Sequence, residues 1–549
     1  MVTFMVKLPA QLGSKNTHYT HADTLRGSYG PGRDWWDVVK YDLHVKLSIT
    51  DSMISGYNDI TLRVLKKGKN LQLDLQEPLI LDSIILLSNT LKHHIINEQF
   101  IVKDGNAYFV SDSLLTVNST NSSNVHLFVY YHGKPRIAKR APWDGGLIWK
   151  KDKNSNPWVS IACQGLGASV WYPCKDHQSD EPQSASLWVT CPDTLLTVGN
   201  GRLLGSSNNK DGTSTFHWGV LSPINNYTII PYIGKYVHFN EVYKGEKGNL
   251  DMDYWVLDYN LEKAKKQFAD AIKMMKAFEY WFGPYPFYKD GYKLVEAPHL
   301  GMEHQSATAY GNGFQNGYLG KDLSGSGWGL TWDFIIVHES GHEWFGNNIT
   351  SKDIADMWIH EGFTNYSETL FTEFYYGKPA ATAYITGIRK SIANDMPIIG
   401  PYNVNKEGSG DMYYKAANMI HTIRQIINDD LLFRKILRGL NSTFYHQTVT
   451  SRQVEDYISL QSKISFSKVF EQYLRTSKVP LLEYRVEKNI LYYRYTNCIK
   501  GFEMPLKIME NPSHWINPNE QWQKDEIPFG KAADFSVDPN FYIKTKKVD

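Results

Sequence analysis

The chain has few cysteines and no long hydrophobic run, and both shortages limit what it can be. Only 4 of its 549 residues are cysteine, and no Cys-x-x-Cys pair occurs. Neither a disulfide framework nor a thiolate zinc site is therefore indicated. The spacing of Cys163 and Cys174 leaves open whether these two side chains pair or stay free. Eighteen consecutive apolar residues occur nowhere, so the sequence predicts no membrane span.

Charge of one sign is not in excess either. The chain holds 58 Lys and Arg against 57 Asp and Glu, which leaves a formal net charge of +1. No local run of Lys and Arg supplies a basic patch, so we expect neither nucleic acid nor an anionic membrane surface as a partner. The first ten residues contain a short apolar patch without a basic start before it, so the sequence predicts no complete signal peptide.

The length and the pattern of apolar residues indicate several domains of different type. A chain of 549 residues is too long for one hydrophobic core. From 34 to 244, short stretches alternate between apolar and polar residues, which is typical of an antiparallel β domain. From 245 to 480 the apolar spacing is mainly helical and includes one long helix over 260–283, and alternation returns over 481–549. We expect an α+β multidomain fold, preceded by a poorly ordered extension over 1–33.

A candidate metal site lies in two neighbouring segments predicted to be helical. His338 and His342 are four residues apart in V-H-E-S-G-H-E-W-F-G-N, so a helix would present both imidazoles on one face. Glu361, in W-I-H-E-G-F, is the candidate third ligand, because two His and one Glu are a known ligand set for catalytic zinc. Glu339 lies between the two histidines and is placed to act on whatever the metal binds. The alternative is a pair of hydrogen-bonded core histidines.

Further motifs accompany the metal segments in a fixed order along the chain. They are Q-G-L-G-A-S-V-W-Y-P-C-K-D from Gln164, G-P-Y-P-F from 283, L-G-M-E-H from 300, and Y-Y-K-A-A from Tyr413. With the metal segments, they resemble the M1 family (gluzincins) of zinc aminopeptidases, in a short form that lacks the large helical C-terminal domain. The resemblance covers nearly everything after about residue 34. It implies a saddle-like N-terminal β domain, a thermolysin-like catalytic domain and a small C-terminal β-sandwich.

The resemblance also implies roles for residues outside the metal segments. Glu303, with Gly301 and Met302 beside it, matches the motif that binds the substrate's free amino group. Gln164 matches the β-domain glutamine that helps hold the same group. Tyr413 matches the tyrosine that donates a hydrogen bond to the oxyanion, with Tyr414 as its rival if the register shifts. One Zn²⁺ per chain, held by His338, His342 and Glu361, would activate water, with Glu339 as general base.

The sequence departs from the family pattern at two positions, and it leaves other choices open. Leu300 stands where the family usually has Gly, and His304 stands where it has Asn, so the backbone and hydrogen bonds around Glu303 should differ from the family pattern. Side chains that orient the imidazoles cannot be selected from sequence among Glu343, Asn347, His360, Thr364 and Glu368.

Two other functions remain as alternatives to an aminopeptidase acting on peptides with a free N-terminus. A thermolysin-like endopeptidase shares the metal motif but has no need of Glu303. A catalytically weak M1-like peptide-binding protein should have lost a ligand, Glu339 or Tyr413, and none is missing. The resemblance to exported bacterial enzymes favours a periplasmic or secreted location over a cytoplasmic one. The preferred N-terminal residue, the peptide length limit and the oligomeric state are not predicted.

Overall fold

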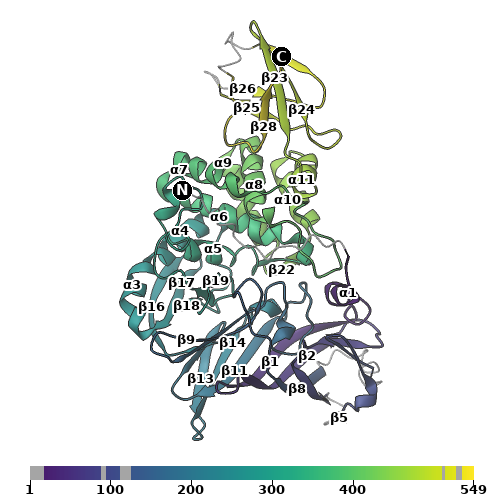
Figure 1. Ribbon diagram of the computed structural model, residues 1–549, viewed down its shortest axis with the longest axis vertical. Helices are drawn as coiled ribbons and strands as arrows, with labels where there is room; N and C mark the ends of the chain where they lie inside the picture. Colours follow the sequence, from purple (N-terminus) through teal and green to yellow (C-terminus); the bar gives the residue numbers. More distant parts are fainter. Residues whose placement is uncertain (1–17, 88–93, 112–124, 510–513, 527–534) are drawn as a thin grey trace.

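The computed structural model describes residues 18–87, 94–111, 125–509, 514–526 and 535–549. A β-rich N-terminal part lies at one end of its long axis, a helical part in the middle and a small C-terminal β part at the other end (Figure 1). This arrangement is the expected α+β fold. All four cysteines lie in the described chain and are free. Among the helices of these described residues, none is long and apolar enough to cross a membrane.

The largest sheet has eight strands in the order β13-β14-β11-β1-β2-β8-β4-β5. Its neighbouring strands are antiparallel, except that β1 and β11 run parallel. Every second side chain of β8 is buried, because one face of the sheet covers the core. The strands are β1 (Trp36–Ser48), β2 (Met53–Val64), β4 (Ile80–Leu87), β5 (His94–Ile95), β8 (Val125–Gly133), β11 (Ser184–Pro192), β13 (Arg202–Asn208) and β14 (Thr213–Val220).

Two smaller sheets complete the N-terminal part. One has the order β12-β15-β10-β9 and the other β3-β7-β6. Their strands are β3 (Leu71–Asp74), β6 (Ile101–Asp104), β7 (Ala107–Val110), β9 (Gly146–Lys151), β10 (Pro157–Ala162), β12 (Leu196–Val198) and β15 (Tyr232–Gly234). The loop that carries Gln164 begins directly after β10, so a strand of the N-terminal part fixes where this loop starts.

A five-stranded sheet of order β16-β17-β18-β20-β19 joins the N-terminal part to the helices. Its strands are β16 (Tyr236–Gly245), β17 (Gly248–Leu257), β18 (Tyr292–Glu296), β19 (Gly301–Met302) and β20 (Thr308–Tyr310). The predicted domain boundary at 244 falls inside the antiparallel hairpin β16–β17, so the change of sheet comes earlier, near Tyr236. Alternation alone could not place this change, because β16 and β17 alternate like the strands before them.

The helical part contains the two predicted metal-binding segments as α5 (Phe334–Gly341) and α6 (Trp358–Tyr376). The Asp333 side chain caps α5 by accepting from Ile335 N and Ile336 N. The expected long helix over 260–283 is interrupted at Phe268, whose ψ of −4° separates two helices. The other helices are α3 (Leu261–Gln267), α4 (Ala269–Phe282), α7 (Lys378–Gly387), α8 (Tyr414–Ile427), α9 (Asp430–Thr443), α10 (Ser451–Ser462) and α11 (Ser467–Leu474). Strands β21 (Ile349–Ser351) and β22 (Gln447–Val449) pair in parallel beside them.

The C-terminal β part packs directly on the helices. It contains a four-stranded sheet, β27-β24-β23-β28, and a β25-β26 pair. The Tyr473 hydroxyl of α11 donates to Tyr542 O, and Tyr542 N donates to the Thr422 hydroxyl of α8, so the two parts share one core. The strands are β23 (Leu481–Glu487), β24 (Ile490–Thr496), β25 (Leu506–Ile508), β26 (His514–Ile516), β27 (Gln523–Glu526) and β28 (Lys544–Lys547).

Part of the expected disordered extension is structured. Residues 1–17 of the segment 1–33 lie outside the described residues, but from His18 onward the chain forms helix α1 (His21–Gly27) and a packed turn. A capping box of Thr20 and Asp23 starts α1. The Arg33 side chain is fully buried and pairs with Asp74 at 2.6 Å. Polar contacts with the β part, rather than an apolar face, hold this segment, which explains why hydrophobic periodicity gave no sign of it.

Candidate metal and active site

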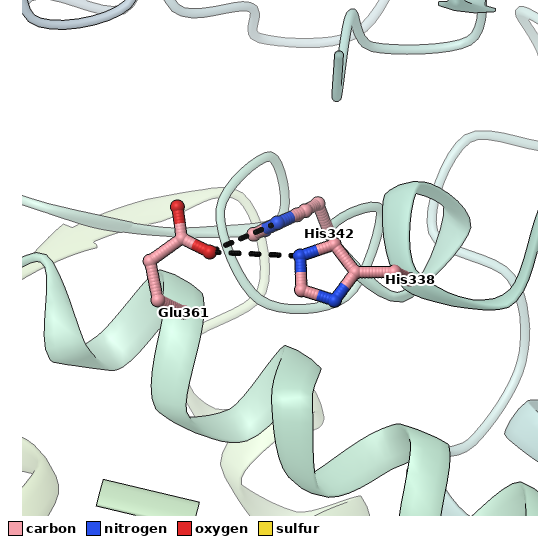
Figure 2. Close-up of side chains that lie close together, drawn as sticks. All are labelled: His338, His342 and Glu361. Atoms are coloured by element: carbon pink, nitrogen blue, oxygen red, sulfur yellow. Dashed lines mark ion pairs between the residues drawn. The ribbon is translucent and has the colours of Figure 1, made fainter. Parts of the chain in front are cut away.

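Three side chains from α5 and α6 converge as the sequence predicted. His338 lies in the last turn of α5, His342 directly after it, and Glu361 in the first turn of α6. Glu361 Oε2 lies 3.4 Å from His342 Nε2 and 3.8 Å from His338 Nε2 (Figure 2). The three residues offer ligand atoms within 4.8 Å of one another, and all three are buried.

A divalent cation fits this group of donors. Glu361 Oε2 is buried and has no hydrogen-bond partner among the described residues, although it faces two imidazole nitrogens. Burying a carboxylate oxygen without a partner costs free energy, because its hydration is lost and not replaced. A cation bound to all three side chains would replace that lost interaction. Two imidazoles and one carboxylate leave a fourth position open, as in catalytic metal sites.

Contacts on the far side of each imidazole turn its Nε2 towards Glu361. His338 Nδ1 lies 2.7 Å from Glu368 Oε1, and His342 Nδ1 lies 3.0 Å from Phe345 O and 3.2 Å from the Thr364 hydroxyl. The Tyr384 hydroxyl donates to the second oxygen of Glu368 at 2.7 Å. Of the five side chains that the sequence could not separate, Glu368 and Thr364 therefore contact the imidazoles.

We expect Glu368→Gln to weaken the affinity for a divalent cation such as Zn²⁺ about 10- to 100-fold, because the carboxylate that orients His338 is lost. Competition with a chromogenic chelator measures this affinity. Glu373→Gln is the matched control, since Glu373 lies on the same helix but pairs with Arg424 at 2.6 Å. Equal affinity in the Glu368 variant and the control would remove Glu368 from the site.

Glu303 and Gln164 meet beside the metal residues, although 139 residues separate them in the chain. Gln164 Nε2 donates to Glu303 Oε1 at 2.6 Å, and the Tyr227 hydroxyl donates to the same oxygen at 3.0 Å. Burial and the nearby charge of Glu361 raise the pKa of the Glu303 carboxyl. Tyr227 was not predicted from the sequence, because it lies in a short turn without a recognisable motif. A second group of metal-type donors, formed by Glu303, Glu339 and His342, overlaps the first and confirms how close Glu303 lies.

The segment that follows α5 holds the Glu303 loop in place. Asn347 Nδ2 donates to Glu303 O at 2.9 Å, and Ser306 N donates to Glu343 Oε1 at 2.8 Å. Glu343 and Asn347, two of the five residues among which the sequence could not choose, join the metal segment to the loop that carries Glu303. His360 accepts a hydrogen bond from Ser351 N at 2.8 Å and is also not an imidazole partner.

Gly301 lies against the carboxylate of Glu339. A Cβ at Gly301 would be 2.6 Å from Glu339 Oε1, so the glycine leaves the space in which this carboxylate sits. We expect Gly301→Ala to displace Glu339 and to lower the turnover of any reaction that depends on it about 10- to 100-fold. Gly205→Ala is the control, because a Cβ there meets nothing within 4 Å. Steady-state kinetics compare the two, and equal rates would contradict this contact.

His304 and Leu300, the two departures from the family pattern, both make hydrogen bonds within the fold. His304 is fully buried, and its Nδ1 lies 2.5 Å from the Tyr232 hydroxyl on β15. Because that hydroxyl donates to Ala307 O at 2.7 Å, His304 acts as the donor. Burial lowers the pKa of His304, so its ring is neutral. Leu300 O accepts from Gly311 N at 2.7 Å, and Met302 is buried in the core on the β side.

Glu339 and Tyr413 both lie beside the metal residues. Glu339 follows His338 in the sequence, and its side chain is half-buried. Burial raises the pKa of its carboxyl to about 7. The Tyr413 ring stacks 6.2 Å from the His338 ring. Tyr413 directly follows the 3₁₀ turn η8 (Gly410–Met412), whereas Tyr414 begins α8 and is buried. On this geometry Tyr413, rather than its neighbour, contacts the metal residues.

One further carboxyl near the site was missed by the sequence analysis. Glu407 is half-buried and lies on the loop before η8. Burial and the charges of Glu361 and Glu303 raise its pKa to about 8. Its loop carries no regular periodicity, so only the folded chain brings this residue to the site.

Several known peptidases are similar to parts of this chain. Residues 267–473 match the peptidase family M1 domain. Endoplasmic reticulum aminopeptidase 1 of Mus musculus is 22% identical over 293 residues, which are 51% of this chain and 31% of that protein. Aminopeptidase B of Rattus norvegicus is 24% identical over 336 residues, 57% of this chain and 47% of that protein. The chain thus spans less than half the length of either relative.

Solved structures of similar fold cover more of the chain. An M1 zinc metallopeptidase from Deinococcus radiodurans superposes with a TM-score of 0.65 at 18% identity, over 82% of this chain and 96% of that one. Aminopeptidase A of Legionella pneumophila, in complex with aspartic acid, gives a TM-score of 0.73 at 14% identity, over 93% of this chain and 59% of that one. At these identities the likeness confirms the fold.

Proposed function

Because this chain contains a peptidase family M1 domain, we propose that it is a zinc-dependent aminopeptidase that hydrolyses the N-terminal residue from peptides. One observation carries the proposal. The buried Glu303 carboxyl and the Gln164 amide, which come from different parts of the fold, meet beside the group His338, His342 and Glu361. A carboxylate at that place would bind a free ammonium, which an endopeptidase does not need.

The metal would be held by His338, His342 and Glu361. A bound Zn²⁺ supplies a Lewis acid that polarises the scissile carbonyl and lowers the pKa of water to about 7. Glu339 would accept the proton of the attacking water and return it to the leaving amine. Tyr413 would donate its hydroxyl hydrogen to the developing oxyanion. Glu303, fixed by Gln164 and Tyr227, would bind the substrate's ammonium and so place the first peptide bond at the metal.

Product analysis tests the proposal against its alternatives. The protein is incubated with an unblocked peptide and with the same peptide N-acetylated, and the products are identified by mass spectrometry. Release of single residues from the unblocked end alone supports an aminopeptidase. Internal fragments from both peptides would indicate a thermolysin-like endopeptidase, and binding without any cleavage would indicate a peptide-binding protein.

A further inference from the structure

The helix α1 segment contacts both the N-terminal β part and the helical part next to Gln164. Gly27 packs so closely on the loop before η8 that a Cβ would meet Asn405 N and Val404 C at 2.2 Å. Asn405 N donates to Asp23 O at 3.1 Å. The α1 segment, residues 20–33, therefore touches a loop of the helical part that lies more than 370 residues further along the chain.

The two sides of this contact meet at one carbonyl group. Arg26 Nη2 donates to Gly165 O at 3.0 Å, and Asn405 Nδ2 donates to the same oxygen at 3.0 Å. Gly165 follows Gln164 directly and has a φ of +69°, in the region that favours glycine. Two donors from two different parts of the fold thus fix the carbonyl of Gly165, the residue after Gln164.

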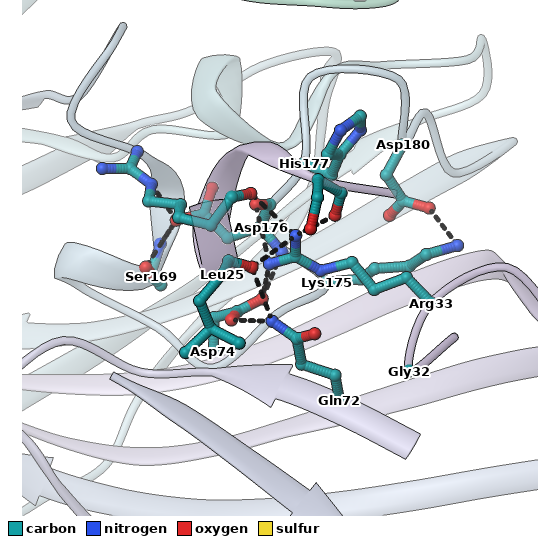
Figure 3. Close-up of polar contacts among 12 residues, drawn as sticks. Leu25, Gly32, Arg33, Gln72, Asp74, Ser169, Lys175, Asp176, His177 and Asp180 are labelled. Atoms are coloured by element: carbon teal, nitrogen blue, oxygen red, sulfur yellow. Dashed lines mark hydrogen bonds and ion pairs between the residues drawn. The ribbon is translucent and has the colours of Figure 1, made fainter. Parts of the chain in front are cut away.

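A buried polar network holds Arg26 in the position that this contact requires. Arg33 pairs with Asp74 at 2.6 Å (Figure 3). It also donates to Arg26 O at 2.7 Å, and the Arg26 side chain lies 3.6 Å from Asp176. A cavity of about 30 Å³ lies beside Arg26, Gly165 and Asn405 and has room for a water molecule. The segment is therefore oriented by directed polar contacts and not by close apolar packing.

We propose that Arg26 and Asn405 are positioning residues, which fix the Gly165 carbonyl and thereby orient the Gln164 amide towards Glu303. This inference rests on the proposed aminopeptidase function. Neither residue touches the metal group, so their effect passes through Gln164. Losing either donor lets the peptide unit at Gly165 rotate, which weakens the contact between Gln164 and Glu303 and raises KM for substrates with a free amino group.

Kinetics of Arg26→Met, Arg26→Lys and Asn405→Ala test the proposal. We expect Arg26→Met and Asn405→Ala each to raise KM for an aminoacyl amide about tenfold with little change in kcat, and Arg26→Lys to restore part of the loss. Arg438→Met is the matched control. Arg438 lies on α9, is partly exposed like Arg26 and pairs with Glu246 at 2.7 Å. Because it makes no hydrogen bond in the described chain to the loop that carries Gln164, its loss should leave KM unchanged.

A double-mutant cycle separates positioning from general stability. In a Gln164→Ala background, Arg26→Met should add nothing further to KM, because the residue through which it acts is gone. A full additional effect in that background, or an unchanged KM in both the Arg26→Met and Asn405→Ala proteins, would overturn the proposal. A lowered melting temperature with unchanged KM counts against it as well.

Amide hydrogen exchange tests the same inference without catalysis. Leu166 N and Gly167 N donate to Gln164 O and Cys163 O, so their exchange reports the geometry of this loop. Faster exchange at both amides in the Arg26→Met protein, but not in Arg438→Met, supports the positioning role, and unchanged exchange contradicts it. This result stands even if the wild-type protein releases no N-terminal residue, an outcome that would refute the proposed function alone.

Discussion

Glu339→Gln is expected to lower kcat about 10²- to 10⁴-fold, the usual contribution of a general base. The substitution keeps the size of the side chain beside Gly301 and removes its ability to accept a proton. Glu339 is no part of the His338, His342 and Glu361 group, so the variant should retain one zinc ion per chain. Turnover of an aminoacyl amide measures the loss.

Metal content and thermal stability of the same variant show whether the loss of turnover comes from lost zinc or from unfolding. Zinc per chain, from elemental analysis, and the melting temperature should equal those of the wild type. The matched control is Glu296→Gln, which alters a buried carboxyl that accepts from Leu257 N at 2.8 Å and from Asn260 at 2.7 Å. Undiminished turnover in the zinc-loaded Glu339→Gln protein would refute the mechanism.

Glu303→Gln should have the second large effect, on substrate selection. Removing one charge of a buried pair typically costs about 2–5 kcal/mol, which corresponds to roughly 30- to 4,000-fold in kcat/KM for a substrate with a free amino group. The amide keeps the volume of the carboxyl, so Gln164 and Tyr227 lose a charged acceptor without a cavity forming. Preference for the unblocked over the N-acetylated substrate should fall by the same factor.

Rates for the two substrates with each variant check this prediction. Glu296→Gln again serves as control and should keep the wild-type preference. If Glu303→Gln lowers the rates for both substrates equally, the carboxylate supports the fold and does not recognise the ammonium.

The sequence was sufficient for the metal group because its geometry is local. His338 and His342 are one helical turn apart, so periodicity alone brings their imidazoles near each other. Glu361 lies in the first turn of the next helix and was selected because two His and one Glu are a known zinc ligand set. The contact between Gln164 and Glu303 spans 139 residues, and no periodicity predicts it. Only the resemblance to a family indicated it in advance, and the residues that the resemblance left unspecified, Tyr227 and Glu407, were missed.

The segment after His18 and the break at Phe268 show two limits of reading periodicity. The α1 segment has no apolar face, yet the buried ion pair between Arg33 and Asp74 holds it on the β part. Apolar spacing continues through 260–283, but Phe268 takes a ψ of −4° and packs edge-on against Tyr310, so the helix divides there. Both outcomes depend on partners distant in sequence, which local patterns do not contain.

Hydrolysis of one matched pair of substrates tests the central claim most directly. The pair is an aminoacyl amide with a free amino group and its N-acetyl derivative, each measured with and without a chelator and after zinc is restored. We expect rapid hydrolysis of the free-amine substrate alone, its loss with the chelator and its return with zinc. Equal hydrolysis of the acetylated substrate, or full activity in the presence of the chelator, would contradict this claim.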